Sequence, residues 1–431
     1  MNVRKSLLNT AGIITLSLAN IISCDSEDSQ QAQVPKQEIF QKSNQKEVVE
    51  GNIERVIQEN ETPSELTTIW AKEIKNVHPE DIRMAIGEDG LTYLAGTTKM
   101  PIDKNSDVNI AIFLAKLDRD GDKVWIKQYG TSKVNMLGGF IVEKMGNLYM
   151  LQSDLDIAKD KEGNAIIDGG KIRFNSRAFL VKYNDEGKEI WKKRLAINEH
   201  SKLESLTINK DYIHVIGENE NGVFIEQYKG DGKQTWCERQ KIKCLDTIIS
   251  DEKGNIYAAG NMGPLGGNEV VVEKYNPSGR TIGLRGFGIK DKYLELLHSN
   301  IDKMGNPYFI GSATGKTNDP TNGNFLSKLD KECNVLWSKI IINMAYVDVG
   351  NKLVFDKDNN IYIIGVGNNM YEPKKNGSII AKYDNNGNEI WRHPFKKGFF
   401  AQDIKIDDYD NLYITGERAW GGVFISKLKQ K

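Results

Sequence analysis

A pair of β-hairpins that recurs along the chain constrains the fold more than any other feature. One copy runs from Asn351 to Trp391. In its first hairpin, two short runs rich in β-branched and aromatic residues flank a turn at residues 357–359, and in its second hairpin similar runs flank a turn at residues 384–388. Four strands in about 41 residues predict one small antiparallel sheet.

Two markers show that this unit occurs seven times. A Tyr in the second strand, usually followed three residues later by Gly, marks the first hairpin: Tyr93 and Gly96, Tyr257 and Gly260, Tyr308 and Gly311, Tyr362 and Gly365, Tyr413 and Gly416, with Tyr149 lacking the Gly and Tyr212 lying farther from Gly217. A Trp seven residues after an Asp-like turn residue marks the second: Trp125, Trp191, Trp236, Trp337 and Trp391, with Gly283 in place of one Trp.

The two ends of the repeat region are complementary. The last copy stops at Lys431 without a Trp strand, whereas an unpaired Trp strand stands at Thr67 to Lys75, before the first hairpin. A closed ring needs this arrangement because the N-terminal strand completes the last sheet and removes the free ends of the array. With about 52 residues per unit, the sequence predicts an all-β fold: a seven-bladed β-propeller over residues 66–431, closed by Thr67 to Lys75.

The N-terminus has the pattern of a secretory signal. A basic start is followed by an apolar run from Leu7 to Ile22, interrupted by Asn9 and Asn20. The run ends at Cys24 and resembles the lipobox of bacterial lipoproteins, with Ser23 matching the pattern and Ile22 departing from it. The resemblance implies a signal peptide over residues 1–23, lipid attachment at Cys24 and membrane anchoring by several acyl chains. The alternative is an ordinary cleaved signal in which Cys24 has no role.

A polar segment over residues 24–65 is predicted to be a tether, because its composition buries too little apolar surface to fold alone. Val49, Ile53, Val56 and Ile57 recur at helical spacing, which predicts a short amphipathic helix near Lys46 to Glu59. The helix would either dock on the domain or stiffen the tether.

The repeats also resemble a known family. The hairpin D-x-x-G-N-x-Y-x-x-G, followed by K-Y-D-x-x-G-x-x-x-W, resembles the SBBP-type β-propeller repeats of bacterial surface proteins. Its second half is similar to the PQQ-like repeat, although one residue shorter between the turn Asp and the Trp. The resemblance implies the propeller fold and leaves the activity open, since propellers host unrelated functions.

Several function classes lack support in the sequence. Lys plus Arg (58) nearly equals Asp plus Glu (59), so no strongly basic surface is predicted and nucleic acid is not an expected partner. The Asp-rich turns, such as Asp118 to Asp122, lack the Gly position of an EF-hand calcium loop and are interpreted as hairpin turns. No metal or cofactor is predicted. Cys237 and Cys244 flank a crossover between strands, and a disulfide between them is left open.

Candidate binding residues are those near the start of the innermost strands, because propeller ligands usually bind at that end of the ring. The repeat register brings seven polar residues toward one axis: Asp81, Arg83, Glu204, Asp246, His298, Lys352 and Asp403. Solvation of a pore mouth would also explain them. Trp420, in the short loop E-R-A-W-G-G, is either an aromatic anchor for a ligand or a plug over the ring end. A long polar loop is expected from Gln152 to Arg177.

The leading functional prediction is a non-enzymatic binding or scaffold lipoprotein at the bacterial cell envelope, which recognises a protein or a glycan at one end of the propeller. The alternative is a propeller enzyme, either a quinone-dependent dehydrogenase or a glycan-cleaving enzyme. The chain shows no identifiable set of nucleophile, base and orienting residue, so no catalytic residue is assigned.

Overall fold

The computed structural model describes most of the repeat region and one short segment before it. The described residues are 53–55, 65–75, 79–87, 90–99, 110–129, 134–143, 146–157, 161–162, 167–168, 171–172, 174–195, 202–210, 212–219, 221–240, 245–262, 268–315, 322–341, 352–367, 377–395, 398–418 and 421–431. The signal segment, Cys24, Cys244 and Trp420 lie outside these ranges, and so does most of the tether.

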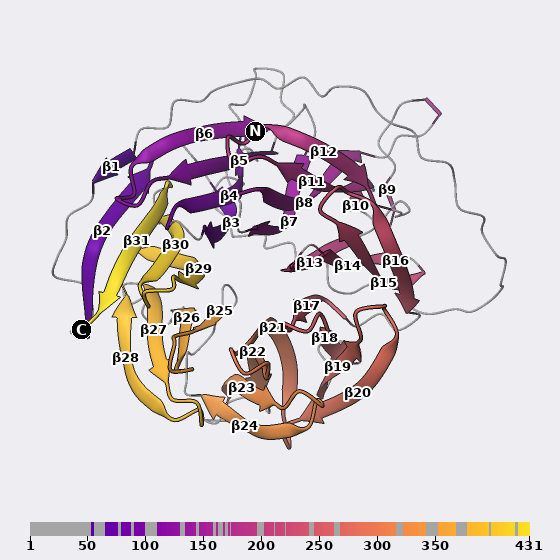
Figure 1. The fold of residues 1–431 in the computed structure, drawn as a ribbon, viewed down its shortest axis with the longest axis vertical. Coiled ribbons are helices and arrows are strands. Elements are labelled where there is room, and N and C mark those ends of the chain that lie inside the picture. Colours follow the sequence, from indigo (N-terminus) through magenta and orange to yellow (C-terminus); the bar gives the residue numbers. More distant parts are fainter. Residues whose placement is uncertain are drawn as a thin grey trace, which may run out of the picture.

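Seven antiparallel sheets form a ring around a central axis, which confirms the predicted seven-bladed β-propeller (Figure 1). Within each blade the first strand lies nearest the axis and the fourth lies at the rim. The described residues contain no helix, and hence none long and apolar enough to cross a membrane.

The strands follow one another in blade order. Blade one comprises β3 (Pro79–Ile86), β4 (Thr92–Lys99), β5 (Ile110–Leu117) and β6 (Lys123–Tyr129); blade two β7 (Val134–Val142), β8 (Leu148–Ile157), β11 (Phe174–Tyr183) and β12 (Glu189–Arg194); blade three β13 (Lys202–Asn209), β14 (Tyr212–Asn219), β15 (Gly222–Lys229) and β16 (Gln234–Gln240); blade four β17 (Thr247–Ser250), β18 (Ile256–Met262), β19 (Glu269–Tyr275) and β20 (Thr281–Gly288). Blade five comprises β21 (Tyr293–Ile301), β22 (Pro307–Thr314), β23 (Gly323–Leu329) and β24 (Val335–Ile341); blade six β25 (Lys352–Phe355), β26 (Ile361–Gly367), β27 (Gly377–Tyr383) and β28 (Glu389–Phe395); blade seven β29 (Phe399–Ile406), β30 (Leu412–Arg418) and β31 (Val423–Gln430), with β2 (Leu66–Ile74) as its fourth strand.

The ring closes through β2, as predicted for the strand at Thr67 to Lys75. β2 pairs antiparallel with β31, from Leu66 opposite Gln430 to Ile74 opposite Val423. The Lys431 backbone N–H also donates to the Glu65 carbonyl at 3.0 Å. Figure 1 shows the C-terminus lying beside β2. The N-terminal strand thus supplies the strand that the last repeat lacks.

The helix expected near Lys46 to Glu59 is wrong for the residues that the structure describes there. Residues 53–55 form the strand β1 (Ile53–Arg55), which pairs with β2 as a fifth strand of blade seven. The outer edge of β2 offers a row of backbone donors and acceptors. Pairing with them satisfies the backbone of β1, whereas a short isolated helix is marginal in water.

Blade two also departs from the sequence prediction. The β8 and β11 ladder extends from Tyr183 opposite Leu148 to Phe174 opposite Ile157, well into the predicted loop from Gln152 to Arg177. Beyond it, β9 (Ile167–Asp168) and β10 (Lys171–Ile172) form a small separate hairpin. The alternation of Leu155 and Ile157 with acidic residues was the strand pattern that the polar composition concealed.

The repeat Trp residues pack between neighbouring blades, as predicted. The Trp70 indole donates to the Arg119 carbonyl of blade one at 2.9 Å. Its ring also covers Gly121, where a methyl group would lie 2.7 Å from the ring. The same contact recurs at four further junctions, with Trp125 over Gly187, Trp191 over Gly232, Trp236 over Gly279 and Trp337 over Gly387. These turn glycines combine a positive φ with a surface that leaves no room for a side chain.

Two junctions lack this contact. Between blades six and seven there is no such turn, because β2 closes blade seven, and the junction between blades four and five differs in sequence. Blade four has Gly283 where the Trp would be, and the facing turn of blade five has Cys333 where the Gly would be. Cys333 still adopts a positive φ of 67° and is buried against the core around Phe287. Without a Trp ring above it, this turn accommodates a side chain, so the two departures from the repeat explain each other.

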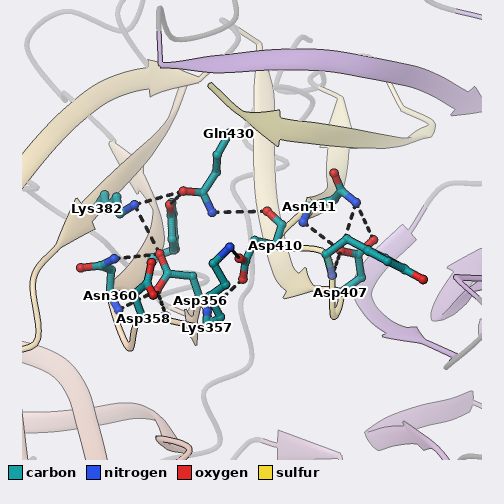
Figure 2. Close-up of polar contacts among 11 residues, drawn as sticks. Asp356, Lys357, Asp358, Asn360, Lys382, Asp407, Asp410, Asn411 and Gln430 are labelled. Carbon is teal, nitrogen blue, oxygen red and sulfur yellow. Dashed lines mark hydrogen bonds and ion pairs between the residues drawn. The ribbon is translucent and has the colours of Figure 1, made fainter.

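A second repeated contact, between a Lys and the repeat Tyr ring, lies at the end of the ring where the hairpin turns are. Lysines of the third strands pass over the repeat Tyr rings with Nζ 4.9–5.5 Å from the ring centroid: Lys116 on Tyr93, Lys182 on Tyr149, Lys274 on Tyr257, Lys328 on Tyr308, Lys382 on Tyr362 and Lys427 on Tyr413. Figure 2 shows one case, where Lys382 contacts Asp356 at 3.3 Å and Gln430 at 3.0 Å. The bond to Gln430 links blade six to the closing blade, within which Gln430 donates to the Asp410 carbonyl.

In blade three a neutral pair of side chains takes the place of the repeat Tyr and its Lys. The prediction that Tyr212 is the repeat Tyr of this blade is wrong. His214, not Tyr212, occupies the equivalent position, three residues before Gly217. It lies opposite Gln227, as Tyr257 lies opposite Lys274, and the two side chains are 2.7 Å apart. Burial lowers the pKa of His214 to about 3, so the imidazole is neutral and needs no charged partner.

Candidate functional site

Four of the seven axial candidate residues lie at one level of the ring. Arg83, His298, Lys352 and Asp403 each pair with the residue directly before the repeat Gly position of the second strand, opposite Ala95, Ile310, Ile364 and Thr415. The equivalent residues of the other blades are Gly139, Ser205 and Thr247. Four of the seven equivalent positions therefore carry an ionisable side chain, each from a different blade.

A β-bulge directly precedes this level in most blades. The ladder register shifts at Gly138 in β7, Glu204 in β13, Leu297 in β21 and Gln402 in β29, and between Pro79 and Ile82 in β3. A bulge bends a strand and redirects its side chains. The residue opposite the bulge is Gly because there is no room for a side chain: a methyl group at Gly311 or Gly416 would overlap a carbonyl oxygen of the bulged strand. The Tyr-x-x-Gly marker thus also marks the level of the site.

These strands surround a cavity of about 430 Å³. Six of the seven axial candidates line it, one from each of six blades: Arg83, Glu204, Asp246, His298, Lys352 and Asp403. Ser205, Thr207, Thr247, Ser299 and Asn300 add hydroxyl and amide groups to its wall. The volume suits a small ligand, or the end of a larger one, and the wall is far more polar than that of a typical apolar pocket.

Two of the cations in the wall are paired with carboxylates. Arg83 contacts Asp81 at 3.3 Å, and Asp81 raises the Arg83 pKa, while burial opposes the rise. Lys405 lies 3.5 Å from Asp403. The carboxylate of Asp403 also accepts the backbone N–H groups of Met84 at 2.7 Å and Ile404 at 2.9 Å, which fixes it across the junction between blades seven and one.

Lys352 and His298 are less well paired. The Lys352 side chain makes no hydrogen bond or ion pair with any residue that the structure describes. Burial, followed by the charge of Arg83, lowers the Lys352 pKa to about 7. Burial, followed by the charge of Lys352, holds the His298 pKa well below its usual value, so the imidazole is neutral. His298 Nδ1 and Arg83 Nε are buried atoms without a hydrogen-bond partner among the described residues.

The structure brings the predicted residues together unevenly. Asp81 does not line the cavity and reaches it through Arg83. Cys24 and Trp420 lie outside the described residues, so lipid attachment and an aromatic anchor stay predictions. Lys405 was missed by the sequence analysis although it lines the same wall. It follows Asp403 by two residues on β29, and alternation along a strand would have placed both on one side.

The other candidate sites have structural explanations. In the Asp118 turn, Oδ1 of Asp118 accepts the backbone N–H groups of Asp120 at 2.9 Å and Asp122 at 2.8 Å, and the Asp356 turn repeats this pattern. No group of three potential metal ligands occurs within the part of the chain that the structure describes. Cys237 is exposed, while Cys244 lies outside the described ranges, so their pairing stays untested.

No protein-family model matches this chain, and no curated protein sequence is significantly similar to it. Solved structures share its fold. A streptogramin B lyase is similar with a TM-score of 0.52 at 11% sequence identity, over 84% of this chain and 97% of the lyase. A protein of unknown function from Dyadobacter fermentans DSM 18053 is similar with a TM-score of 0.51 at 10% identity, over 86% of this chain and 100% of that one. At such identities the likeness shows the fold alone.

Proposed function

We propose that this chain is a non-enzymatic binding protein of the bacterial cell envelope, anchored through lipid on Cys24, which recognises a glycan or a protein at one end of the propeller. The observation that carries the binding part is the axial cavity. Six blades each contribute one polar candidate residue to it, although these residues are spread from Arg83 to Asp403 along the chain. Polar groups converging on a concave site are typical of ligand recognition.

The rest of the ring supports this proposal by being rigid and well paired. Trp rings contact the next blade at five junctions. At the other two, Lys274 reaches the Lys331 carbonyl and Lys382 reaches Gln430. The blades that form the cavity wall are therefore joined to one another without a ligand. A preformed site loses less conformational entropy on binding. The anchoring part rests on the apolar run that ends at Cys24 and on the polar segment after it.

The experiment compares binding to a glycan panel and to an envelope extract. The full chain is immobilised in three forms: the wild type, the cavity variant Asp246→Ala with Lys352→Met, and the surface control Lys357→Met. Lys357 is a suitable control because its side chain is 68% exposed and lies outside the cavity. A ligand retained by the wild type and the control, and lost by the cavity variant, is the expected result. A ligand retained equally by all three would place the site elsewhere.

A second candidate function is catalysis in the same cavity. It is favoured by one observation: Lys352 lines the cavity with a pKa of about 7, so its amine can accept or donate a proton near neutral pH. The streptogramin B lyase shows that a propeller of similar architecture can be an enzyme. Release of sugar from a glycan, or reduction of a dye that depends on a quinone, would support this alternative, and loss of the turnover in Lys352→Met would assign it to the cavity.

A further inference from the structure

The charges around the cavity are distributed unequally between blades. Cationic or potentially cationic groups come from blades one, five, six and seven: Arg83, His298, Lys352 and Lys405. The carboxylates that line blades three and four are Glu204 and Asp246. Because blades three and four lie across the ring from blades seven and one, the cavity has a cationic wall and an acidic wall (Figure 1).

On the cationic wall, positive charge exceeds negative charge. Arg83 forms an ion pair with Asp81 and Lys405 forms one with Asp403, whereas the ammonium of Lys352 forms no ion pair with a described residue. Lys352 is half-buried, and removing part of a cation's hydration without an ion-pair partner is costly. Such groups in clefts are candidates for ligand binding or for a reaction. Neutral His298 can donate one N–H without adding charge.

We propose that this wall, formed by Arg83, His298, Lys352 and Lys405, binds an oxyanion of the ligand, a carboxylate or a phosphate. The inference rests on the proposed function, because it assumes that the axial cavity is the binding site. The anion supplies the ion-pair partner that Lys352 lacks among the described residues, and it accepts hydrogen bonds from Lys352 and from the imidazole. Charge-assisted hydrogen bonds of this kind are short and strong. The acidic wall disfavours the same group on the opposite side, which fixes the orientation of the ligand.

The protonation of Lys352 supports the inference. The titratable and charged groups that act on Lys352 are Arg83 and Asp81 on β3 and Asp403 and Lys405 on β29, and it acts in turn on His298 of β21. Arg83 and Lys405 lower the Lys352 pKa, and the two carboxylates raise it. A bound anion acts in the same direction as the carboxylates. Near pH 8 the anion should therefore bind together with a proton.

The test measures the binding of simple anions to the full chain by thermal shift and by titration calorimetry at pH 7 and low ionic strength. Inorganic phosphate and sulfate represent the phosphate class, glucuronic acid and acetate represent the carboxylate class, and chloride at equal ionic strength is the electrolyte control. The variants are Lys352→Met, the charge-preserving Lys352→Arg and the surface control Lys357→Met.

We expect phosphate or glucuronic acid, at about 10 to 100 times its Kd, to raise the melting temperature of the wild type by about 2–5 °C. Lys357→Met and Lys352→Arg should bind the anion as the wild type does. Lys352→Met should bind it about tenfold to hundredfold more weakly than the wild type. Whichever anion class binds identifies the chemistry. Equal shifts in all variants, or none above chloride, would overturn the inference. If instead a neutral ligand from the glycan panel binds the wild type and Lys352→Met equally, but not Asp246→Ala, the proposed function stands and the oxyanion inference is wrong.

Discussion

Lysines occur in two contrasting settings in this ring. Six on the third strands lie over the repeat Tyr rings, and each reaches at least one oxygen acceptor near the hairpin turns, as Lys382 reaches Asp356. Lys352, on a first strand, lies in the axial cavity with no such acceptor among the described residues. The repeat lysines recur with the structural unit and stabilise it. Lys352 belongs to one blade, and no requirement of the fold explains its charge.

The largest effect is expected at the closing blade. Trp70 is 6% exposed, packs on Gly121 and donates to Arg119 of the next blade. Trp70→Ala should lower the free energy of unfolding by about 3–5 kcal/mol, measured by denaturant unfolding. Tyr409→Ala is the control, because Tyr409 is 84% exposed. Equal losses in the two variants would mean that Trp70 does not close the ring.

Removal of a paired lysine should cost somewhat less. In Lys382→Met, the carboxylate of Asp356, whose side chain is 3% exposed, loses its ion-pair partner. A buried charge without its partner destabilises the folded state, here by about 3 kcal/mol. Thermal unfolding at pH 7 measures the loss. An unchanged melting temperature would show that the turn-end lysines are as dispensable as surface ones.

Replacing the cavity lysine by Met, in Lys352→Met, should raise the free energy of unfolding, whereas Lys382→Met lowers it. The Lys352 pKa is lowered to about 7 from 10.5, so the folded state binds fewer protons than the unfolded state between these values. The destabilisation is fully present below pH 7 and declines as the pH rises toward 10.5. Lys352→Met should therefore be more stable than the wild type by about 1–3 kcal/mol at pH 6, with a smaller difference at pH 9. A variant less stable than the wild type at pH 6 would contradict the unpaired state of Lys352.

The smallest effect is expected at the junction between blades four and five. Cys333→Gly restores the repeat residue at a positive φ but removes a buried side chain. The relief of backbone strain and the lost packing are both about 1 kcal/mol, so the net change should be within about 1 kcal/mol. At the equivalent position under Trp337, Gly387→Ala should destabilise by about 1–3 kcal/mol, because the methyl group would lie 2.7 Å from the ring. Similar values for the two variants would remove the distinction between the junctions.

Much of the fold was predictable because it repeats. The Tyr and Trp markers count the blades, and the strand at Thr67 to Lys75 explains the closure without any coordinate. Local exceptions were less predictable. In blade three the repeat Tyr position is occupied by His214, so the sequence analysis took the nearby Tyr212 as the repeat residue. The segment around Ile53 has a helical pattern, yet pairing with the edge of β2 decides its structure.

The site was predictable in its level but not in its chemistry. The start of the innermost strands located Arg83, His298, Lys352 and Asp403, since equivalent repeat positions face one axis. Sequence could not show that Asp81 pairs with Arg83, or that Lys352 has no partner, because these facts depend on distances between blades. The bulges were also hidden, although a repeat Gly faces most of them, as Gly96, Gly311 and Gly416 do.

The most direct test of the account measures the reactivity of each lysine toward trace acetylation at pH 8, followed by mass spectrometry. An amine with a pKa of about 7 is mostly neutral at this pH and reacts readily, whereas the paired Lys382 should react slowly. The account predicts that Lys352 is labelled faster than Lys382, and that a ligand which binds the chain slows labelling at Lys352 alone. A ligand that binds without protecting Lys352 would contradict the claim that the axial cavity is the binding site.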